Sequence, residues 1–362
     1  MTCTIMHFRP TVALLSLCAF LLTIAGSTTA AEAAQTSSSS KQRQPVTPEP
    51  WQEAVVSVTD LTQSTRFFTE IGDYKTRWQG PIDSSLIRTW GLPEGASGEA
   101  ILLGPSAAER GLVRLVRFDN AGRREPMRPG SRAWDTGCYF SLMIRMKDMQ
   151  AVFDDAIALG WWTETPITDL RFGESKLKIV IYRGPDGLQV QGYERLSPSL
   201  PDSIDPFKRI ARPFNMMQMV RDRDEAYRFY TEILGFDTFY YGKPYVAKEP
   251  EYTPLGIPRN LTTEVAYKAG ITYPVAGEYG RMEMIEIIGL EGRDYADRCH
   301  APNLGILAVR FEVEDAEAAR ALLQSRGAEV GELSAATLNP YGNIKLFEAK
   351  TPDGAIIQFY ER

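Results

Sequence analysis

The chain has 362 residues, of which 44% are hydrophobic and 24% are charged. This composition is ordinary for a globular protein, and the length suggests two or three domains. A formal net charge of -6 argues against a nucleic-acid-binding protein, which needs a basic face.

The first 34 residues have the pattern of a cleavable export signal. His7 and Arg9 precede an apolar run from Val12 to Ala25, which has the length of a signal-peptide core and is short for a membrane span. Small residues suited to a cleavage site follow this run. We therefore predict a signal peptide over residues 1–34 and a periplasmic or secreted protein that has no membrane anchor after cleavage. An uncleaved anchor is the alternative.

Residues 35–50 are mostly Ser, Gln and Pro, with almost nothing apolar. Such a segment buries too little surface to offset the entropy of ordering it, so we predict a flexible linker, with ordered structure from about Trp51. Cys138 and Cys299 are the two cysteines that remain after signal removal. In an oxidising compartment they could form a disulfide, or they could be two separately buried thiols, and their spacing does not decide between these.

An internal repeat organises the rest of the chain. Val58–Ile71 aligns without a gap on Val220–Ile233, and Pro185–Arg195 matches Pro352–Arg362 in the same order and at nearly constant spacing. The mature chain is therefore a duplication.

Each half of the duplication divides again into two units. A strand pattern at Phe140–Met146 is followed by Asp148 and a helical pattern, and Leu307–Val313 is followed in the same way by Asp315. Several strand patterns follow each helix, which predicts four βαβββ units and an α+β fold. Residues 196–210 are rich in proline and predict a connector. We thus expect a first domain over residues 51–195 and a second over residues 211–362, with two units in each.

These units resemble one known superfamily. A first strand ending in Val-x-Asp, a helix carrying Arg-Phe-Tyr and a final Pro-Asp-Gly turn are similar to the module of the glyoxalase / bleomycin-resistance / extradiol dioxygenase (vicinal oxygen chelate) superfamily. The best local matches are Val220–Phe236 and Thr351–Gly354, and the resemblance covers residues 51–362. It implies that two modules pair into a curved mixed sheet around a cavity, so four modules imply two such cups, one in each half.

The resemblance also implies where a metal ion would lie. Members of the superfamily hold a divalent ion with His or Glu on first strands and Glu on last strands, facing into the cup. Seven residues before the Asp that ends each first strand, the corresponding positions are Glu53, Ser141, Asn215 and Ala308. On the last strands the position falls on Gln191 and Gln358, and on the fourth strands of the first and third units it falls near Arg117 (or Arg114) and Glu286 (or Glu283).

None of these positions carries a histidine. His300, in a loop, is the single histidine after signal removal, so ligation by two imidazoles is impossible. We therefore predict no His-ligated metal. A ring-cleaving iron dioxygenase is the branch of the superfamily that the sequence disfavours most, because its iron needs the missing histidines.

The two halves imply different sites. The first half offers Glu53, Arg117, Ser141 and Gln191, and a guanidinium beside a carboxylate suits an anion or a carbonyl oxygen better than a divalent cation. The second half offers Asn215, Glu286 and Gln358, and Glu286 with Gln358 could hold Mg²⁺ or Ca²⁺ rather than Zn²⁺ or Fe²⁺. A register slip of one residue would turn any of these side chains outward.

Two functions follow from this resemblance, and the sequence leaves both open. The first is metal-free binding of a small oxygenated organic molecule outside the cytoplasm. The second is a lyase or isomerase of the glyoxalase type, with Glu286 or Glu53 as the base or metal ligand and Arg117 as the partner of an oxyanion. A purely structural interaction module is a third reading. The sequence identifies neither the ligand nor the oligomeric state.

Overall fold

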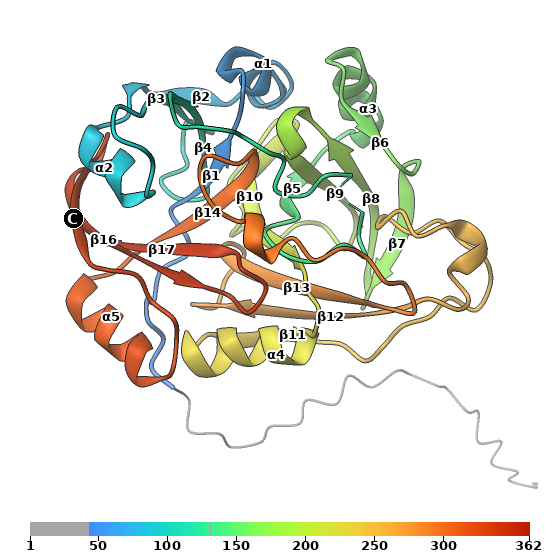
Figure 1. The fold of residues 1–362 in the computed structure, drawn as a ribbon. Coiled ribbons are helices and arrows are strands. Elements are labelled where there is room, and N and C mark those ends of the chain that lie inside the picture. The colour runs from blue at the N-terminus through green and yellow to red at the C-terminus, as the bar shows by residue number, and fades with distance from the viewer. Residues whose placement is uncertain (1–42, 131) are drawn as a thin grey trace, which may run out of the picture. The chain divides into compact units, whose positions relative to one another are not determined.

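The computed structural model describes residues 43–130 and 132–362 (Figure 1). The chain divides into residues 1–41 and residues 42–362, and every described residue belongs to the second unit. The predicted signal peptide (1–34) and the first part of the predicted linker (35–42) lie outside the described residues. Within the described ranges, no helix is long and apolar enough to cross a membrane.

Each of the four predicted units is present as a module of strands and one main helix. Module 1 contains β1 (Glu53–Ser57), α1 (Leu61–Arg66), β2 (Lys75–Pro81), a short α2 (Ser84–Thr89), β3 (Ser97–Gly104) and β4 (Leu112–Asp119). Module 2 contains β5 (Ser141–Met146), α3 (Met149–Ala158), β6 (Trp162–Thr163), β7 (Thr168–Phe172), β8 (Ser175–Arg183) and β9 (Gln189–Ser197).

The second half repeats this order. Module 3 contains β10 (Ile210–Met219), α4 (Arg223–Arg228), β11 (Asp237–Tyr241), β12 (Ala266–Tyr273) and β13 (Arg281–Ile288). Module 4 contains β14 (Gly305–Glu312), α5 (Ala316–Ser325), β15 (Ser334–Leu338), β16 (Gly342–Lys350) and β17 (Ile356–Glu361). Helices α1 and α4 continue as π-helical turns at Phe67–Ile71 and Phe229–Ile233, so the sequence repeat extends to an irregular backbone feature.

An aspartate starts the main helix of every module. The side-chain carboxylates of Asp60, Asp148, Asp222 and Asp315 accept backbone N–H groups in the first turns of α1, α3, α4 and α5. This satisfies N–H groups that have no partner inside the helix. The site positions on the first strands were counted back from these aspartates. The helix starts therefore also fix where those positions lie.

The modules pair in an order that the sequence analysis did not predict. One sheet has the order β15-β16-β17-β14-β1-β4-β3-β2, and the other has the order β11-β12-β13-β10-β5-β9-β8-β6, with β7 on β8. Module 1 therefore pairs with module 4, and module 2 with module 3. In Figure 1 the blue β1 lies beside the orange β14, and the green β5 beside the yellow-green β10. The prediction of one cup from residues 51–195 and another from residues 211–362 was wrong on this point.

We call the sheet of modules 1 and 4 cup 1, and the sheet of modules 2 and 3 cup 2. Both are curved mixed sheets, so the predicted α+β fold of four modules paired into two cups is confirmed. The two cups share one hydrophobic core, to which Phe67 and Trp161 contribute a ring stack and Phe311 contributes a fully buried ring. This shared core explains why residues 42–362 form a single compact unit.

Three connections join the two cups. Cys138 and Cys299 form a disulfide between the segments that lead into β5 and β14, which resolves the alternative left open by their spacing. The Asp186 carboxylate accepts the Thr59 backbone N–H (2.6 Å), and the Asp353 carboxylate accepts the Arg221 backbone N–H (2.9 Å). The turn before the last strand of a module in one cup thus supports a helix start in the other cup.

The predicted linker does not extend to residue 50. Val46 and Thr47 are 8% and 0% exposed. The Val46 N–H donates to the Leu234 carbonyl (2.9 Å), and the Thr47 hydroxyl donates to the Glu312 carbonyl (2.8 Å). Ordered structure therefore begins before Trp51, because a single apolar residue and a threonine find partners in the second half of the chain.

Candidate functional site

The strand register shows which side chains occupy equivalent inward positions of the two cups. In cup 1, Glu53 lies opposite Arg310, Val55 opposite Arg114 and Arg310 opposite Gln358. In cup 2, Asn215 lies opposite Met143, Met217 opposite Glu283 and Met143 opposite Gln191. Alternation along each strand then gives two equivalent sets of four. They are Glu53, Ala308, Arg114 and Gln358 in cup 1, and Ser141, Asn215, Gln191 and Glu283 in cup 2.

The centre of cup 1 is one carboxylate held by two guanidinium groups. Arg114 donates to Glu53 through Nε (2.7 Å) and Nη2 (3.0 Å), and Arg310 donates through Nη1 (2.5 Å). The Tyr341 hydroxyl donates to the other Glu53 oxygen (3.0 Å). Arg310 also donates to the Gln358 amide oxygen (2.7 Å). The exposed fractions of Glu53, Arg114 and Arg310 are 0%, 3% and 1%, so the charged network is fully buried.

The electrostatics of cup 1 favour an ionised carboxylate. Burial raises the pKa of Glu53, but the charges of Arg114 and Arg310 outweigh it and hold this pKa below its ordinary value. Glu348, which accepts a hydrogen bond from the Gln358 amide (2.6 Å), has a raised pKa because it is buried. Two cations beside one firmly ionised carboxylate leave the network with an excess of positive charge.

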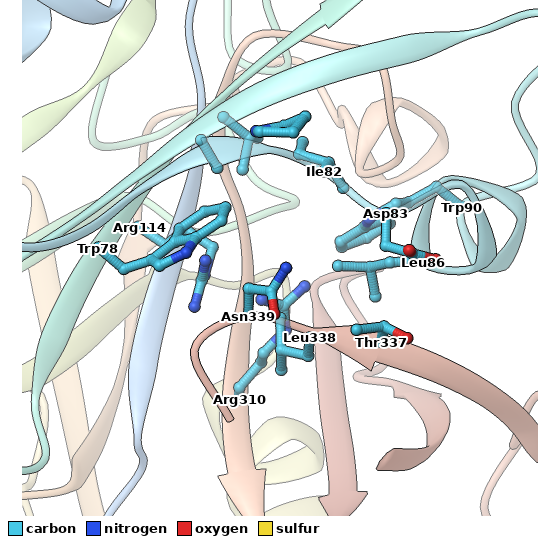
Figure 2. Close-up of a pocket in the computed structure, with 13 residues that line it drawn as sticks. Trp78, Ile82, Asp83, Leu86, Trp90, Arg114, Arg310, Thr337, Leu338 and Asn339 are labelled. Carbon is cyan, nitrogen blue, oxygen red and sulfur yellow. The ribbon is translucent and has the colours of Figure 1, made fainter. Parts of the chain in front are cut away.

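A small pocket opens onto the two arginines (Figure 2). Figure 2 shows Trp78 and Arg114 on one side and Ile82, Leu86 and Trp90 on the other, with Arg310 below. The Arg114 guanidinium lies 5.6 Å from the centre of the Trp78 ring, and that of Arg310 lies 5.9 Å from the Trp90 ring. The free volume is about 10 Å³, close to what one water molecule needs.

A larger pocket, lined in part by Tyr341, lies on the same face of the sheet. Its volume is about 490 Å³, and Leu102 and Leu112 line it together with Arg77, Arg110 and Arg362. Leu102 and Leu112 alternate with the lining residues Ala100 and Arg114 of the small pocket, so both pockets belong to the inward face of cup 1. The Tyr341 side chain, which donates to Glu53, lines the larger pocket.

Cup 2 has a different centre. The Glu283 carboxylate accepts a hydrogen bond from the Asn215 amide (2.6 Å), which also approaches the sulfur of Met143 (3.1 Å). Burial raises the pKa of Glu283 to about 7, against the opposing effects of the Asn215 hydrogen bond and the charge of Arg281. Among the described residues, the amide oxygens of Asn215 and Gln191 are buried without a hydrogen-bond partner. Cup 2 thus carries a carboxyl group that changes charge near neutral pH.

Two predicted site residues do not face into the cups. Arg117 points away from Arg114 on β4, is 34% exposed in its side chain and pairs with Asp119 (3.2 Å) and Glu99 (3.5 Å). Glu286 accepts the backbone N–H of Arg223 (2.8 Å) at the start of α4 and pairs with Lys268 (2.9 Å). Both residues lie three positions from the inward residue of their strand, and an odd offset turns a side chain to the other face.

The predicted sets are also recombined by the module pairing. Glu53 and Gln358 lie in cup 1, whereas Ser141, Gln191 and Asn215 lie in cup 2. Glu53 therefore does not meet Ser141 or Gln191, and Gln358 does not meet Asn215 or Glu286. His300 lies in an exposed loop with its Nδ1 against the Ala301 carbonyl (2.8 Å).

A divalent cation does not fit cup 1, because Arg114, Arg310 and Tyr341 occupy both Glu53 oxygens and two guanidiniums repel it. In cup 2, the Asn215 amide turns its nitrogen towards Glu283, so the carboxylate and the amide satisfy each other instead of converging on an ion. Within the described part of the chain, no group of three or more His, Cys, Asp or Glu side chains could hold a metal. The inward positions thus disagree with the metal site that the fold implies.

Sequence reasoning missed Arg310 and Tyr341. Arg310 lies two residues after the counted position Ala308, so strand alternation alone places it on the same inward face. Tyr341 lies in the β15–β16 turn and comes to Glu53 from module 4, whose partner the sequence did not identify.

The comparisons with known proteins agree with this architecture. Residues 212–359 match the model of the Glyoxalase/Bleomycin resistance protein/Dioxygenase superfamily. Glyoxalase I from Zea mays has a similar fold, with a TM-score of 0.55, 14% sequence identity, and 86% of this chain and 92% of that chain covered. A putative dioxygenase from Bacillus subtilis has a TM-score of 0.51 and 11% identity over 86% of this chain and 84% of that chain. No curated protein matches the chain. Residues 212–359 thus belong to the glyoxalase / bleomycin-resistance / dioxygenase (vicinal oxygen chelate) superfamily, and the whole chain, with four modules paired into two cups, has a glyoxalase-like fold.

Proposed function

We propose that this protein is exported and that cup 1 binds a small organic anion, such as a carboxylate, through Arg114 and Arg310 without a metal ion. One observation carries the proposal: two buried guanidiniums share one buried carboxylate at the inherited metal position. The excess positive charge suits an acceptor-only group, and a carboxylate matches the planar fork of an arginine.

The walls of the small pocket support an organic rather than an inorganic anion. Ile82, Leu86 and Trp90 are apolar and face the arginines across the pocket. Ligand sites combine such apolar walls with a few charged groups that fix orientation. Since the free volume is about 10 Å³, the ligand needs an outward movement of the partly exposed Trp78 or Trp90 side chain. The signal-like N-terminus and the Cys138–Cys299 disulfide support export, because disulfides persist in oxidising compartments.

The test compares carboxylates with neutral analogues of the same shape. Acetate, pyruvate and benzoate, and the amides of these acids, would be titrated calorimetrically into the purified mature protein before and after treatment with a chelator. We expect a carboxylate to bind at least about tenfold more tightly than its amide, since hydrogen bonds to charged groups are the stronger ones. The chelator should change nothing. Equal binding of acid and amide, or binding that needs added metal, contradicts the proposal.

Cup 2 supports a second candidate function, acid–base catalysis of the lyase or isomerase type. The supporting observation is Glu283, a buried carboxyl group whose pKa is raised to about 7, which is where a general base is most effective. Its carboxylate would take a proton from a carbon next to a carbonyl group, and the Asn215 amide (2.6 Å) would orient it.

Deuterium exchange at such carbons gives a direct readout of this second candidate. Small 2-oxo and 2-hydroxy carbonyl compounds would be incubated with the protein in D₂O and followed by NMR. We expect exchange that rises with pH around 7 and is lost in Glu283→Gln, while Glu286→Gln on the opposite face retains it. Exchange at the same rate in both variants would exclude Glu283 as the base.

A further inference from the structure

Cup 2 contains a second pair of arginines that neither the sequence repeat nor the proposed function of cup 1 accounts for. Arg145 lies on β5, in line with Ser141 and Met143, and Arg281 lies on β13, in line with Glu283. Both reach the same carboxylate oxygen: Glu278 Oε2 is 2.6 Å from Arg145 Nη2 and 3.5 Å from Arg281 Nη2. As in cup 1, two guanidiniums share one carboxylate, but at other positions of the sheet.

The faces of these guanidiniums are covered by aromatic rings. The Arg145 guanidinium carbon lies 3.9 Å from the centre of the Phe214 ring and 5.5 Å from that of Tyr279. The corresponding carbon of Arg281 lies 3.8 Å from the centre of the Phe239 ring. Rings above a guanidinium attract its charge, yet they leave its N–H bonds, which lie in its plane, available to acceptors.

Several of these N–H bonds have no acceptor. Arg145 is 2% exposed and Arg281 is 9% exposed. Among the described residues, Arg145 Nε and Nη1 and Arg281 Nε are buried without a hydrogen-bond partner, and so is Nε of Arg195 on the neighbouring β9. Buried donors in native proteins have partners, either in the protein or in a bound water or ion. Here the donors belong to cations that share a single carboxylate, so the missing partner is better supplied by an anion than by water.

We propose that cup 2 holds a small oxyanion, of the carboxylate or phosphate type, between Arg145 and Arg281. Its oxygens accept from the free edges of the two guanidiniums, while Phe214 and Phe239 exclude water from their faces. Glu278, bound to Nη2 of both arginines, partly neutralises their charge and so opposes the binding of an oxyanion. This site uses none of the residues of cup 1, so it can be tested independently of the anion site proposed there.

Stoichiometry and a pair of opposing variants test the proposal. Acetate and inorganic phosphate would each be titrated into the whole mature protein at constant ionic strength, with chloride as an anion that lacks oxygen atoms. We expect Arg145→Met to remove one bound oxyanion per chain, and Glu278→Gln, which removes the competing carboxylate, to tighten binding at least tenfold. Arg117→Met, on the outer face of cup 1, serves as the matched control and should leave both values unchanged.

The same titrations distinguish the two proposed anion sites. Loss of a bound oxyanion in Arg114→Met but not in Arg145→Met places the only site in cup 1 and overturns the inference for cup 2. The reverse result supports the inference and refutes the proposed function of cup 1. If Arg145→Met does not fold, the Glu278→Gln variant decides alone: unchanged affinity for acetate and phosphate, or a response to chloride equal to theirs, overturns the proposal.

Discussion

Glu53 in cup 1 and Glu283 in cup 2 are both fully or almost fully buried on the inward face of a curved sheet, with exposed fractions of 0% and 7%. Their ionisation differs in direction. The pKa of Glu53 is lowered by Arg114 and Arg310, which outweigh burial, and the pKa of Glu283 is raised to about 7 because burial outweighs a single amide and a more distant arginine. Both carboxyl groups are buried to a similar degree, so the neighbouring side chains decide whether each carboxyl group is ionised.

The neighbours differ because the four modules have diverged at two inward positions. On the two first strands of each cup, this position holds Glu53 and Ala308 in cup 1, and Ser141 and Asn215 in cup 2. On the two last strands of each cup, the corresponding position holds Arg114 and Gln358 in cup 1, and Gln191 and Glu283 in cup 2. At these positions cup 1 therefore places a cation beside its carboxylate, whereas cup 2 places only amides and a hydroxyl there. One duplicated scaffold thus presents a cationic site and a protonatable site.

The largest expected effect is that of removing the carboxylate of cup 1. Glu53→Gln leaves Arg114 and Arg310 buried without their counter-charge, and breaking a buried ion pair in this way costs about 3–5 kcal/mol of the free energy of unfolding. Urea denaturation measures it. The exposed pair of Arg66 and Glu70 gives the control, since solvent screens such a pair and Glu70→Gln should have a much smaller effect. A similar small cost for Glu53→Gln would mean that the cup 1 network is not buried as described.

The disulfide between Cys138 and Cys299 is expected to have the next largest effect, and it acts on both cups. It ties the segment before β5 of cup 2 to the segment before β14 of cup 1, across 161 residues of sequence. Replacing both cysteines by serine should lower the free energy of unfolding by about 2–4 kcal/mol, because the unfolded chain is no longer cross-linked. The denaturation midpoint of the wild type should fall on reduction, and that of the double variant should not. An unchanged midpoint after complete reduction speaks against this cross-link.

Glu283 makes stability depend on pH with a sign opposite to that of Glu53. Below pH 4.5, the ordinary pKa of the group, it is protonated in both the folded and the unfolded chain, and burial has no cost. As pH rises towards the folded pKa of about 7, the unfolded chain loses the proton first, so stability falls by roughly 3 kcal/mol between pH 4.5 and pH 8.

The Glu283→Gln variant isolates this effect from other titrating groups. The variant should be more stable than the wild type at pH 8, and the difference should vanish near pH 4. Denaturation midpoints across this range provide the measurement. Glu286→Gln, on the opposite face of β13, should show no such pH-dependent difference. If Glu283→Gln instead destabilises the protein, and does so more at pH 8 than at pH 4, its carboxylate is ionised and paired in the way that Glu53 is.

The inward first-strand positions could be predicted because each is tied to a helix start. Asp60, Asp148 and Asp222 begin helices, and counting seven residues back from them reaches Glu53, Ser141 and Asn215, all of them buried. A strand has a side-chain period of two, so a fixed distance from a capped helix also fixes the face. The Pro-Asp-Gly turns fixed Gln191 and Gln358 in the same way.

The fourth strands of modules 1 and 3 offered no such anchor. Arg114 and Arg117 are separated by two apolar residues, as are Glu283 and Glu286, and both faces of these strands are covered, so no alternation of polar and apolar residues marks the inward side. The pairing of modules was also hidden. Since the modules are copies, the sequence of β1 does not distinguish pairing with β14 from pairing with β5. The pairing with β14 depends on contacts between residues more than 200 positions apart in the chain, such as Glu53 with Arg310.

The smallest expected effect tests that register directly. Arg117→Met removes a half-exposed side chain paired with Asp119 and Glu99, and such surface pairs contribute only about 0–1 kcal/mol. We expect a change below roughly 0.5 kcal/mol in the free energy of unfolding and an unchanged carboxylate titration. Arg114→Met, three residues earlier on the inward face, should abolish the response to carboxylates. Because three residues reverse the face of a strand, loss of carboxylate binding in Arg117→Met with retention in Arg114→Met would show that β4 presents its other face to the cup, and the Glu53 network would have to be rebuilt around Arg117.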